Sequence, residues 1–341
     1  MNDRLRKLLA ALFACALFAG AASAGTEERL GTGGNTAGLI MVGARSVGLA
    51  YSNLASTQGV EAMFGNPAGL AMGTANTEVM FSHAEYIADM NLNYVALAQK
   101  MGGWGSVGFT AKILSIGDII RTTETAPDGT GDIVQPTFTT LGLSYAKALT
   151  DRVNFGGTMH LISEKVMQTG STSVAFDFGF QYDTGVRGIR VGAAMQNFGG
   201  AQLFSGEDMD RNLLLPEDDP QSANRTVSLS TAGAELPALF TGSGSWPVLQ
   251  GVNALTLHGV YQSNSFDVDE FRLGGEFTYR KQFSLRLGYK ATSSSDEIFG
   301  LTYGLGAQIP IGSTKMDLDY AGQTVSDFFN DVQHVGLTFR F

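Results

Sequence analysis

The last eight residues of the chain, 334–341, constrain its fold more than any other segment. Apolar residues occupy every second position there, so that Val335, Leu337, Phe339 and Phe341 alternate with His334, Gly336, Thr338 and Arg340. Successive side chains of a β-strand point to opposite faces of its sheet. The segment therefore predicts a strand with one apolar face, which must be covered by a second sheet or by lipid.

Similar alternating segments follow one another along most of the chain. The clearest cover 106–113, 174–183, 271–280, 283–290 and 299–306, and weaker ones lie at about 76–87, 91–101, 138–149, 152–164, 188–198, 225–235, 252–263 and 314–322. With the closing strand they number about 14, and each is about ten residues long, as a tilted membrane-spanning strand must be. Longer connections are expected at about 115–136, 199–224, 236–250 and 323–331.

The polar faces of these strands favour a barrel over a sandwich. Glycine makes up 44 of the 341 residues, and only 16% of the residues are charged, against about 25% in ordinary soluble domains. Inward-facing glycine leaves room for something packed in a lumen. We therefore expect an all-β fold, a transmembrane antiparallel β-barrel of about 14 strands formed by residues 76–341, with outer-membrane lipid around it. The expected polar lumen residues are Lys112, Asp177, Glu276, Arg286 and Asp319. A secreted β-sandwich or β-helix is the alternative.

Residues 1–24 have the pattern of a secretory signal peptide. A basic start, a short apolar core and a small-residue cleavage site follow one another as Arg4, Arg6 and Lys7, then residues 8–19, then Ala22-Ser23-Ala24. The apolar run is too short to cross a bilayer as a helix, and a poor lipoprotein motif ending at Cys15 is the alternative. Cleavage near Ala24 would leave 317 residues with a net charge of −12 and no cysteine. The expected location is the cell outer membrane.

Residues 25–75, between the signal peptide and the first strand, have a different pattern. From Val42 onward apolar residues recur at helical spacing, through Ala44 to Ala55. In the stretch Asn66, Pro67, Ala68, Gly69 and Leu70, an N-cap residue precedes proline at the first helical position. The glycine-rich run 31–38 follows no strand and precedes no Lys-Ser/Thr pair, so a nucleotide-binding loop is rejected. A short helical region ahead of the first strand predicts a plug inside the lumen.

Two stretches of this region resemble a known family. Residues 43–50 (GARSVGLA) and 62–71 (AMFGNPAGLA) are similar to the N-terminal signature of the PorV/PorQ family of FadL-like outer-membrane barrels, and shorter similar stretches lie at 196–200, 285–290 and 318–321. The resemblance implies a 14-stranded barrel and a role in type IX protein secretion, with a translocon and cargo proteins as partners.

The wider FadL-like superfamily implies an alternative function. Its members carry long-chain fatty acids or other hydrophobic compounds through a plugged lumen and a lateral opening, so the alternative partner is a hydrophobic ligand in the lumen. An aromatic C-terminal residue, here Phe341, resembles the signal that the barrel assembly machinery reads.

Two segments at 199–224 and 234–249 mix apolar and acidic residues in what we expect to be exposed loops. Apolar side chains on exposed loops form candidate binding surfaces for a protein or a lipid-like ligand. The candidate patch consists of Leu203, Phe204, Leu213, Leu214, Leu215, Phe240 and Trp246. The alternative is that these side chains pack against one another over the barrel mouth.

The sequence predicts no enzymatic activity and no cofactor. Its four histidines are far apart, none has metal-ligand spacing, and no Gly-x-Ser-x-Gly nucleophile motif occurs. Acidic runs at 207–210 and 217–219 are typical of solvated loops, although a divalent cation is the alternative reading. The net charge of −10 argues against a nucleic-acid partner, because phosphate binding requires clustered Lys and Arg.

Overall fold

A computed structural model describes residue 29 and residues 31–213, 225–293, 297–326 and 329–341. The predicted signal peptide, the patch residues Leu214 and Leu215 and the acidic run 217–219 lie outside the described residues. Among the described residues, no helix has both the length and the apolar character needed to cross a bilayer.

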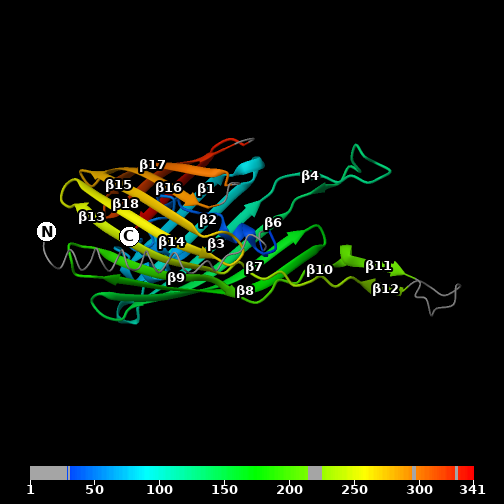
Figure 1. Cartoon of the computed structure of the whole chain (residues 1–341), viewed down its shortest axis with the longest axis horizontal. Coiled ribbons are helices and arrows are strands. Elements are labelled where there is room, and N and C mark those ends of the chain that lie inside the picture. The colour runs from blue at the N-terminus through cyan, green and yellow to red at the C-terminus, as the bar shows by residue number, and fades with distance from the viewer. Residues whose placement is uncertain (1–28, 30, 214–224, 294–296, 327–328) are drawn as a thin grey trace.

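Fourteen long strands form a closed antiparallel barrel (Figure 1). Each pairs with the next, β1 pairs with β19, and β8 pairs with β9 to complete the ring. The predicted fold class is therefore confirmed. The strands are β1 (Thr77–Glu85), β2 (Asn91–Lys100), β3 (Ser106–Ser115), β6 (Thr137–Ala148), β7 (Val153–Val166), β8 (Thr169–Asp183), β9 (Arg190–Gly199), β13 (Leu239–Leu249), β14 (Ala254–Asn264), β15 (Glu270–Tyr279), β16 (Phe283–Thr292), β17 (Phe299–Ile311), β18 (Thr314–Val325) and β19 (Val332–Arg340).

The two ends of the barrel differ. Short turns lie at one end, the turn end, and long connections lie at the other, the loop end. In a membrane barrel short turns face the periplasm and long loops face outward. Two arms project from the loop end (Figure 1). One contains β4 (Ile119–Ile120) and β5 (Ile133–Val134), and the other contains β10 (Ser205–Gly206), β11 (Asp210–Leu213) and β12 (Arg225–Ser228).

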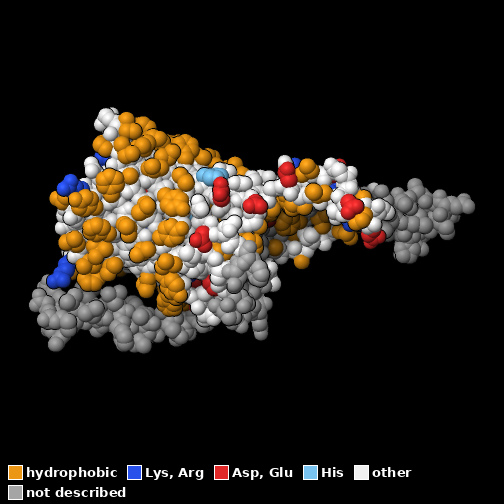
Figure 2. Space-filling view, turned by 90° about the horizontal axis from the view of Figure 1, so that it is seen from above, with side chains coloured by type: hydrophobic (Ala, Val, Ile, Leu, Met, Phe, Trp, Pro, Cys, Tyr) orange, Lys and Arg blue, Asp and Glu red, His pale blue; other side chains and the backbone are white. Residues whose placement is uncertain are grey.

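Side chains alternate between the outer surface and the lumen along every long strand. On β3, Phe109 is 47% exposed whereas its neighbour Thr110 is buried, and on β19 Val335 is exposed whereas His334 is buried. Figure 2 shows the resulting apolar outer surface, with Lys and Arg side chains at the turn end. A broad apolar belt with basic residues at one rim is the surface expected of a barrel in lipid.

One predicted strand is misplaced. Residues 225–235 do not enter the barrel, because β12 stops at Ser228 and pairs only with β11. The missing wall strand is β13, in a segment that the sequence pattern assigned to a loop. Its outward positions include Gly242 and Gly244, which have no side chain and so interrupt the apolar stripe between Phe240 and Trp246. Phe240 and Trp246 are therefore exposed wall residues, not loop residues as expected.

The N-terminal region, from residue 31 to residue 75, lies inside the barrel and is called the plug below (Figure 1). Its helical pieces are α2 (Thr36–Leu39), α3 (Ala44–Val47), η2 (Gly59–Glu61), α4 (Ala62–Gly65) and η3 (Pro67–Met72). The helical spacing predicted over 44–55 is wrong beyond Val47. Ala50 and Tyr51 have φ values of 50° and 56°, which a right-handed helix does not admit.

The plug packs against glycines of the barrel wall, where its backbone approaches the strands closely. A methyl group added to Gly179 of β8 would lie 2.8 Å from Pro67 Cδ and 3.0 Å from Ala68 N. On β17, Gly304 meets Gly48 of the plug in the same way, with 3.2 Å between an added methyl and the Gly48 Cα. Other wall glycines against which the plug packs are Gly108, Gly156, Gly192, Gly274, Gly288 and Gly336. The inward-facing glycines of the wall thus leave room in the lumen for the plug backbone.

Candidate functional site

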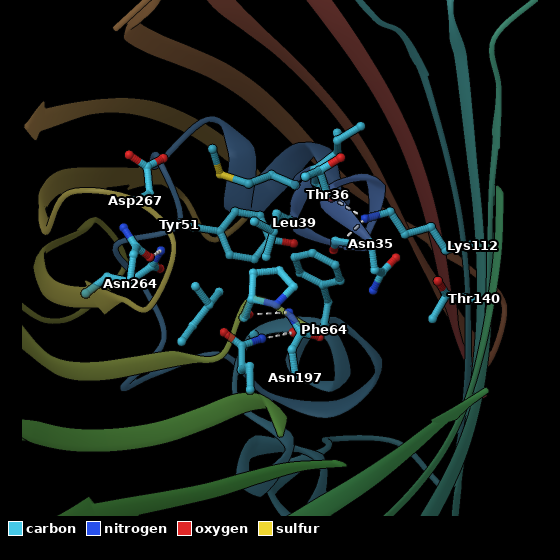
Figure 3. A pocket seen from close by; sticks show the side chains of 18 of the residues that line it. Asn35, Thr36, Leu39, Tyr51, Phe64, Lys112, Thr140, Asn197, Asn264 and Asp267 are labelled. Atoms are coloured by element: carbon cyan, nitrogen blue, oxygen red, sulfur yellow. Dashed lines mark hydrogen bonds between the residues drawn. The ribbon is translucent and has the colours of Figure 1, made fainter. Parts of the chain in front are cut away.

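A cavity of about 330 Å³ lies between the plug and the loop end of the barrel (Figure 3). Its plug side is lined by apolar residues, among them Leu39, Met41, Leu54, Met63 and Phe64. Its wall side is lined by side chains from strands all around the barrel, including Tyr94, Lys112, Thr140, His160, Asp177, Asn197, Leu239, Gln262, Arg272, Lys290 and His334. The cavity is thus enclosed by the wall at its sides and by the plug beneath. We call it the upper cavity.

Three aromatic rings form the floor of the upper cavity. The Phe64 ring meets the Tyr51 ring edge to face, with 5.4 Å between centroids, and the Tyr94 ring at 6.5 Å. Tyr51 lies in the plug and its hydroxyl donates to the carbonyl oxygen of Val42, while burial raises the pKa of this phenol. Edge-to-face clusters of this kind are stable apolar platforms. The floor therefore offers an apolar surface of three packed rings to a solute.

The motif at residues 66–70 fixes the floor in position. The Asn66 side chain accepts a hydrogen bond from Ala68 N at 3.3 Å, which caps η3 as the sequence predicts. Its amide nitrogen donates to Phe180 O of β8 at 3.1 Å and to Leu54 O at 3.2 Å. On β9, Gln196 donates to Phe64 O at 2.7 Å. Hydrogen bonds with the neighbouring strands β8 and β9 thus hold the plug next to the aromatic floor.

Lys112 and Asp177, two of the predicted lumen residues, line this cavity. Lys112 Nζ donates to the carbonyl oxygens of Gly38 and Ile40, at 2.9 and 2.5 Å, and lies 4.8 Å from the Phe64 ring centroid. Asp177 Oδ2 lies 2.8 Å from His160 Nε2, and its other oxygen accepts a hydrogen bond from Asn197 N at 2.7 Å. Both charged side chains therefore interact with partners inside the protein: Lys112 with two backbone carbonyls of the plug, and Asp177 with His160 and the backbone of Asn197.

The other charged residues of the upper cavity belong to one cluster on β15, β16 and the adjacent loops. Arg272 donates two hydrogen bonds to Glu270 Oε2, at 2.6 and 3.0 Å, and Lys290 Nζ lies 2.5 Å from Glu297. Asp267, in the loop before β15, also lines the cavity, and burial raises the pKa of its carboxyl group. The cluster forms one charged side of the cavity.

The remaining predicted lumen residues, Glu276, Arg286 and Asp319, meet on the opposite side of the plug. Arg286 donates to Glu276 at 2.8 Å and to Asp319 at 2.6 Å. They line a second, polar cavity of about 580 Å³ that faces the turn end. Arg45 of the plug joins them, and the carboxylate of Glu276, followed by that of Glu61, raises its pKa. The plug thus separates an upper cavity with an apolar floor from a charged lower one.

The predicted loop patch does not form one site. Leu203 is exposed and Phe204 half-buried in the connection after β9, whereas Phe240 and Trp246 face outward from β13. Leu213 ends β11, in an arm that projects from the barrel. None of these residues lines the upper cavity.

The aromatic floor was missed by sequence reasoning, although β2 carries a signal for it. On this strand the inward residues Leu92, Tyr94, Ala96 and Ala98 are apolar, and so are Val95 and Leu97, which face outward. A strand that is apolar on both faces indicates an apolar surface inside the lumen. Within the described residues, no group of three or more His, Cys, Asp or Glu side chains is arranged to hold a metal ion.

Comparisons with known proteins identify the fold. No family model and no curated protein matches the chain. Among solved structures, the CymD monoaromatic hydrocarbon channel matches 88% of this chain and 97% of its own length, with a TM-score of 0.57 and 12% identity. The toluene transporter TbuX of Ralstonia pickettii covers 83% and 94% (TM-score 0.53, 13% identity), and the toluene transporter TodX of Pseudomonas putida covers 84% and 94% (0.53, 10%). At this level of identity the likeness shows the fold alone, a closed β-barrel like those of these channels and transporters.

Proposed function

We propose that this protein resides in the outer membrane and passes small hydrophobic compounds through its lumen. The observation that carries this proposal is the aromatic floor of Tyr51, Phe64 and Tyr94, enclosed in a cavity of about 330 Å³. Cavities of this size that are mainly apolar with a few polar groups are typical binding sites for small molecules. The plug beneath the cavity blocks a straight aqueous path, which a porin for polar solutes would need.

A second observation supports passage through the side of the barrel. The ladder between β9 and β13 ends at the pair Gln196 and Leu239. Directly beyond this pair the two segments are joined by a hydrogen bond from Asn197 Nδ2 to Pro237 O, at 3.3 Å, and farther along by an antiparallel bridge between Gln202 and Ala234. Asn197 also has a positive φ of 56°, at an irregularity in the β8–β9 ladder. Bulges of this kind interrupt strand pairing and bend the strand.

This interruption of the β9–β13 ladder lies between exposed apolar side chains of the outer surface and the upper cavity. Phe198, the next residue along β9, pairs with Phe176 of β8, and both side chains are exposed on the outer surface. On the inside, Asn197, Pro237 and Leu239 line the cavity. A solute that leaves between β9 and residue 237 would therefore enter the apolar part of the bilayer without crossing the charged lower cavity.

The alternative function, service in type IX secretion, rests on the resemblance of residues 43–50 and 62–71 to the PorV/PorQ family. These residues lie in the plug, around the aromatic floor and the charged lower cavity, and not on an exposed surface that a translocon would contact. Their positions therefore favour transport. A pull-down of the full chain from solubilised outer membranes would support secretion if a large translocon or a cargo protein were recovered.

Uptake into proteoliposomes tests the proposed transport. The full barrel should accelerate entry of a radiolabelled monoaromatic or medium-chain apolar solute at least fivefold over empty vesicles. Phe64→Ala should abolish most of this increase, because it removes the centre of the floor. Phe109→Ala, which removes an exposed side chain of the outer surface, is the matched control and should not change uptake. Equal entry with and without the protein would overturn the proposal.

A further inference from the structure

Charged side chains are distributed unevenly between the two ends of the barrel. The residues of the short turns, all of which the structure describes, are mainly basic, with Arg152, Arg187, Arg280 and Lys281 against Asp151. The connection 116–136 at the loop end has the opposite balance, with Asp118, Glu124, Asp128 and Asp132 against Arg121. Figure 2 shows Lys and Arg side chains gathered at the turn end. This end is therefore positively charged, although the chain has a net charge of −10.

We infer that the turn end binds the head groups of anionic phospholipids, and that Lys147 and its neighbours on the outer wall form one such site. Basic side chains near a membrane surface attract anionic lipids, and the attraction falls off within a Debye length. The inference goes beyond the proposed transport and shares with it only the placement of the barrel in a membrane.

Lys147 projects from the outer wall at the turn end. It is the next-to-last residue of β6 and is exposed on the same face as Leu143 and Tyr145. Its cross-strand partner on β7 is Phe155, which is also exposed. A lysine at the edge of an apolar face lays its stem along that face and keeps its ammonium group among polar groups. Around a barrel in a bilayer, the polar groups at that edge are lipid head groups.

An aromatic side chain marks the same position as a membrane interface. Trp104, in the turn between β2 and β3, is 81% exposed. Its carbonyl oxygen accepts a hydrogen bond from the Tyr145 hydroxyl at 2.6 Å, and a methyl group added to the next residue, Gly105, would lie 3.4 Å from Lys147 Cβ. The turn is thus held beside Lys147. Exposed Trp and Tyr side chains of membrane proteins gather at the level of the head groups.

The basic groups at this site are available to a ligand. The ion pairs among the described residues include neither Lys147 nor Arg152, which lies in the turn after β6. Asp151, in the same turn, offsets one of the two positive charges and leaves an excess. An anionic phosphodiester would therefore be attracted without displacing an ion-pair partner, whereas a zwitterionic head group carries its own cation and gains less.

Fluorescence quenching by brominated lipids tests this inference in vesicles of phosphatidylcholine that contain the full chain. Trp246→Phe leaves Trp104 as the only tryptophan and so reports on lipid beside Lys147. Brominated phosphatidylglycerol should associate with this site about fivefold more tightly than brominated phosphatidylcholine. The preference should disappear at about 1 M sodium chloride, where the Debye length is about 3 Å.

Substitutions in this single-tryptophan chain assign the preference to Lys147. Lys147→Gln should remove most of it and leave quenching by brominated phosphatidylcholine unchanged, whereas Lys147→Arg should retain it. The matched control is Lys165→Gln, because Lys165 is the exposed next-to-last residue of β7 at the loop end. This control should quench as the parent chain does.

The outcomes separate this inference from the proposed function. Equal quenching of Trp104 by the two brominated lipids would overturn the inference and leave the transport proposal standing, and the positive turn end would then face a soluble acidic partner instead. Quenching by neither lipid would place Trp104 outside the membrane and overturn both. Weaker quenching by both lipids in Lys147→Gln would show that Lys147 only positions Trp104, and would overturn its role as a head-group contact.

Discussion

The guanidinium group of Arg45 donates two hydrogen bonds to the carboxylate of Glu276, at 3.1 and 3.0 Å, and so ties helix α3 of the plug to strand β15 of the wall. The pair continues in both directions, because Arg45 also contacts Glu61 and Glu276 also contacts Arg286. Acids and bases thus alternate from the plug into the wall. The arrangement gives the plug one preferred orientation, since charged partners must meet in a fixed order.

Arg45→Met is expected to loosen the plug. Glu276 keeps Arg286 and Glu61 keeps Arg340, so neither acid is left alone. The loss of stability should therefore be about 1–2 kcal/mol, below the roughly 3–5 kcal/mol of an orphaned buried charge. Urea unfolding of the barrel in lipid vesicles measures it. The control is Arg121→Met, which breaks an exposed pair with Asp132 and should cost less than about 1 kcal/mol.

Gly179→Ala is expected to displace the plug from the wall. The new methyl group would press on Pro67 and Ala68, and overpacking of this kind costs about 1–3 kcal/mol. Planar bilayer recordings should show a higher ion conductance than that of the unchanged chain, because the plug no longer fills the lumen. Gly244→Ala on β13 adds a methyl group to open space and should leave the conductance unchanged. Equal conductance in both variants would contradict the close packing of plug and wall.

Leu287→Arg tests whether the outer surface faces lipid. Leu287 lies near the middle of β16 and is 51% exposed. Arginine at the bilayer midplane of a barrel costs about 2–4 kcal/mol, so the variant should refold into vesicles at lower urea concentrations than the unchanged chain. Ile120→Arg on β4 is an exposed control outside the barrel and should have no measurable effect. A soluble sheet would treat the two positions alike.

The sequence predicts most strands of the barrel wall, because membrane strands have a simple alternating pattern of apolar and polar residues. Lipid outside and polar groups inside impose a period of two, and β15, β16 and β19 follow it closely. The pattern is lost in β13, where outward glycines hide it, and it wrongly predicts a wall strand in the neighbouring segment 225–235. A strand is predicted from alternating apolar and polar side chains, so the prediction fails where outward positions are occupied by glycine, which has no side chain.

The candidate site was harder to predict because it is built from contacts between distant residues. Lys112 and Asp177 were expected in the lumen, and the structure places them in the upper cavity. Their pairing with plug carbonyls and with Asn197 depends on how the plug folds back. The turn at Ala50 and Tyr51 sets that fold, and positive φ values at such residues leave no sequence pattern. The aromatic floor therefore could not be predicted from the sequence, because it depends on how the plug folds.

A reversible cross-link between residues 197 and 237 is expected to stop transport through the side of the barrel. Cys15, in the predicted signal peptide, is the only cysteine of the chain, so Asn197→Cys with Pro237→Cys introduces one defined pair. Oxidation would replace the single hydrogen bond that joins these positions with a covalent bond. Solute uptake into proteoliposomes should fall at least fivefold on oxidation and recover with reductant.

Ser144→Cys with Thr158→Cys joins β6 to β7, where the two hydroxyl oxygens are 2.8 Å apart in a regular ladder. Oxidation of this control pair should leave uptake unchanged, because the wall there is already closed. Equal uptake by the oxidised and reduced forms of the first pair would place the exit elsewhere.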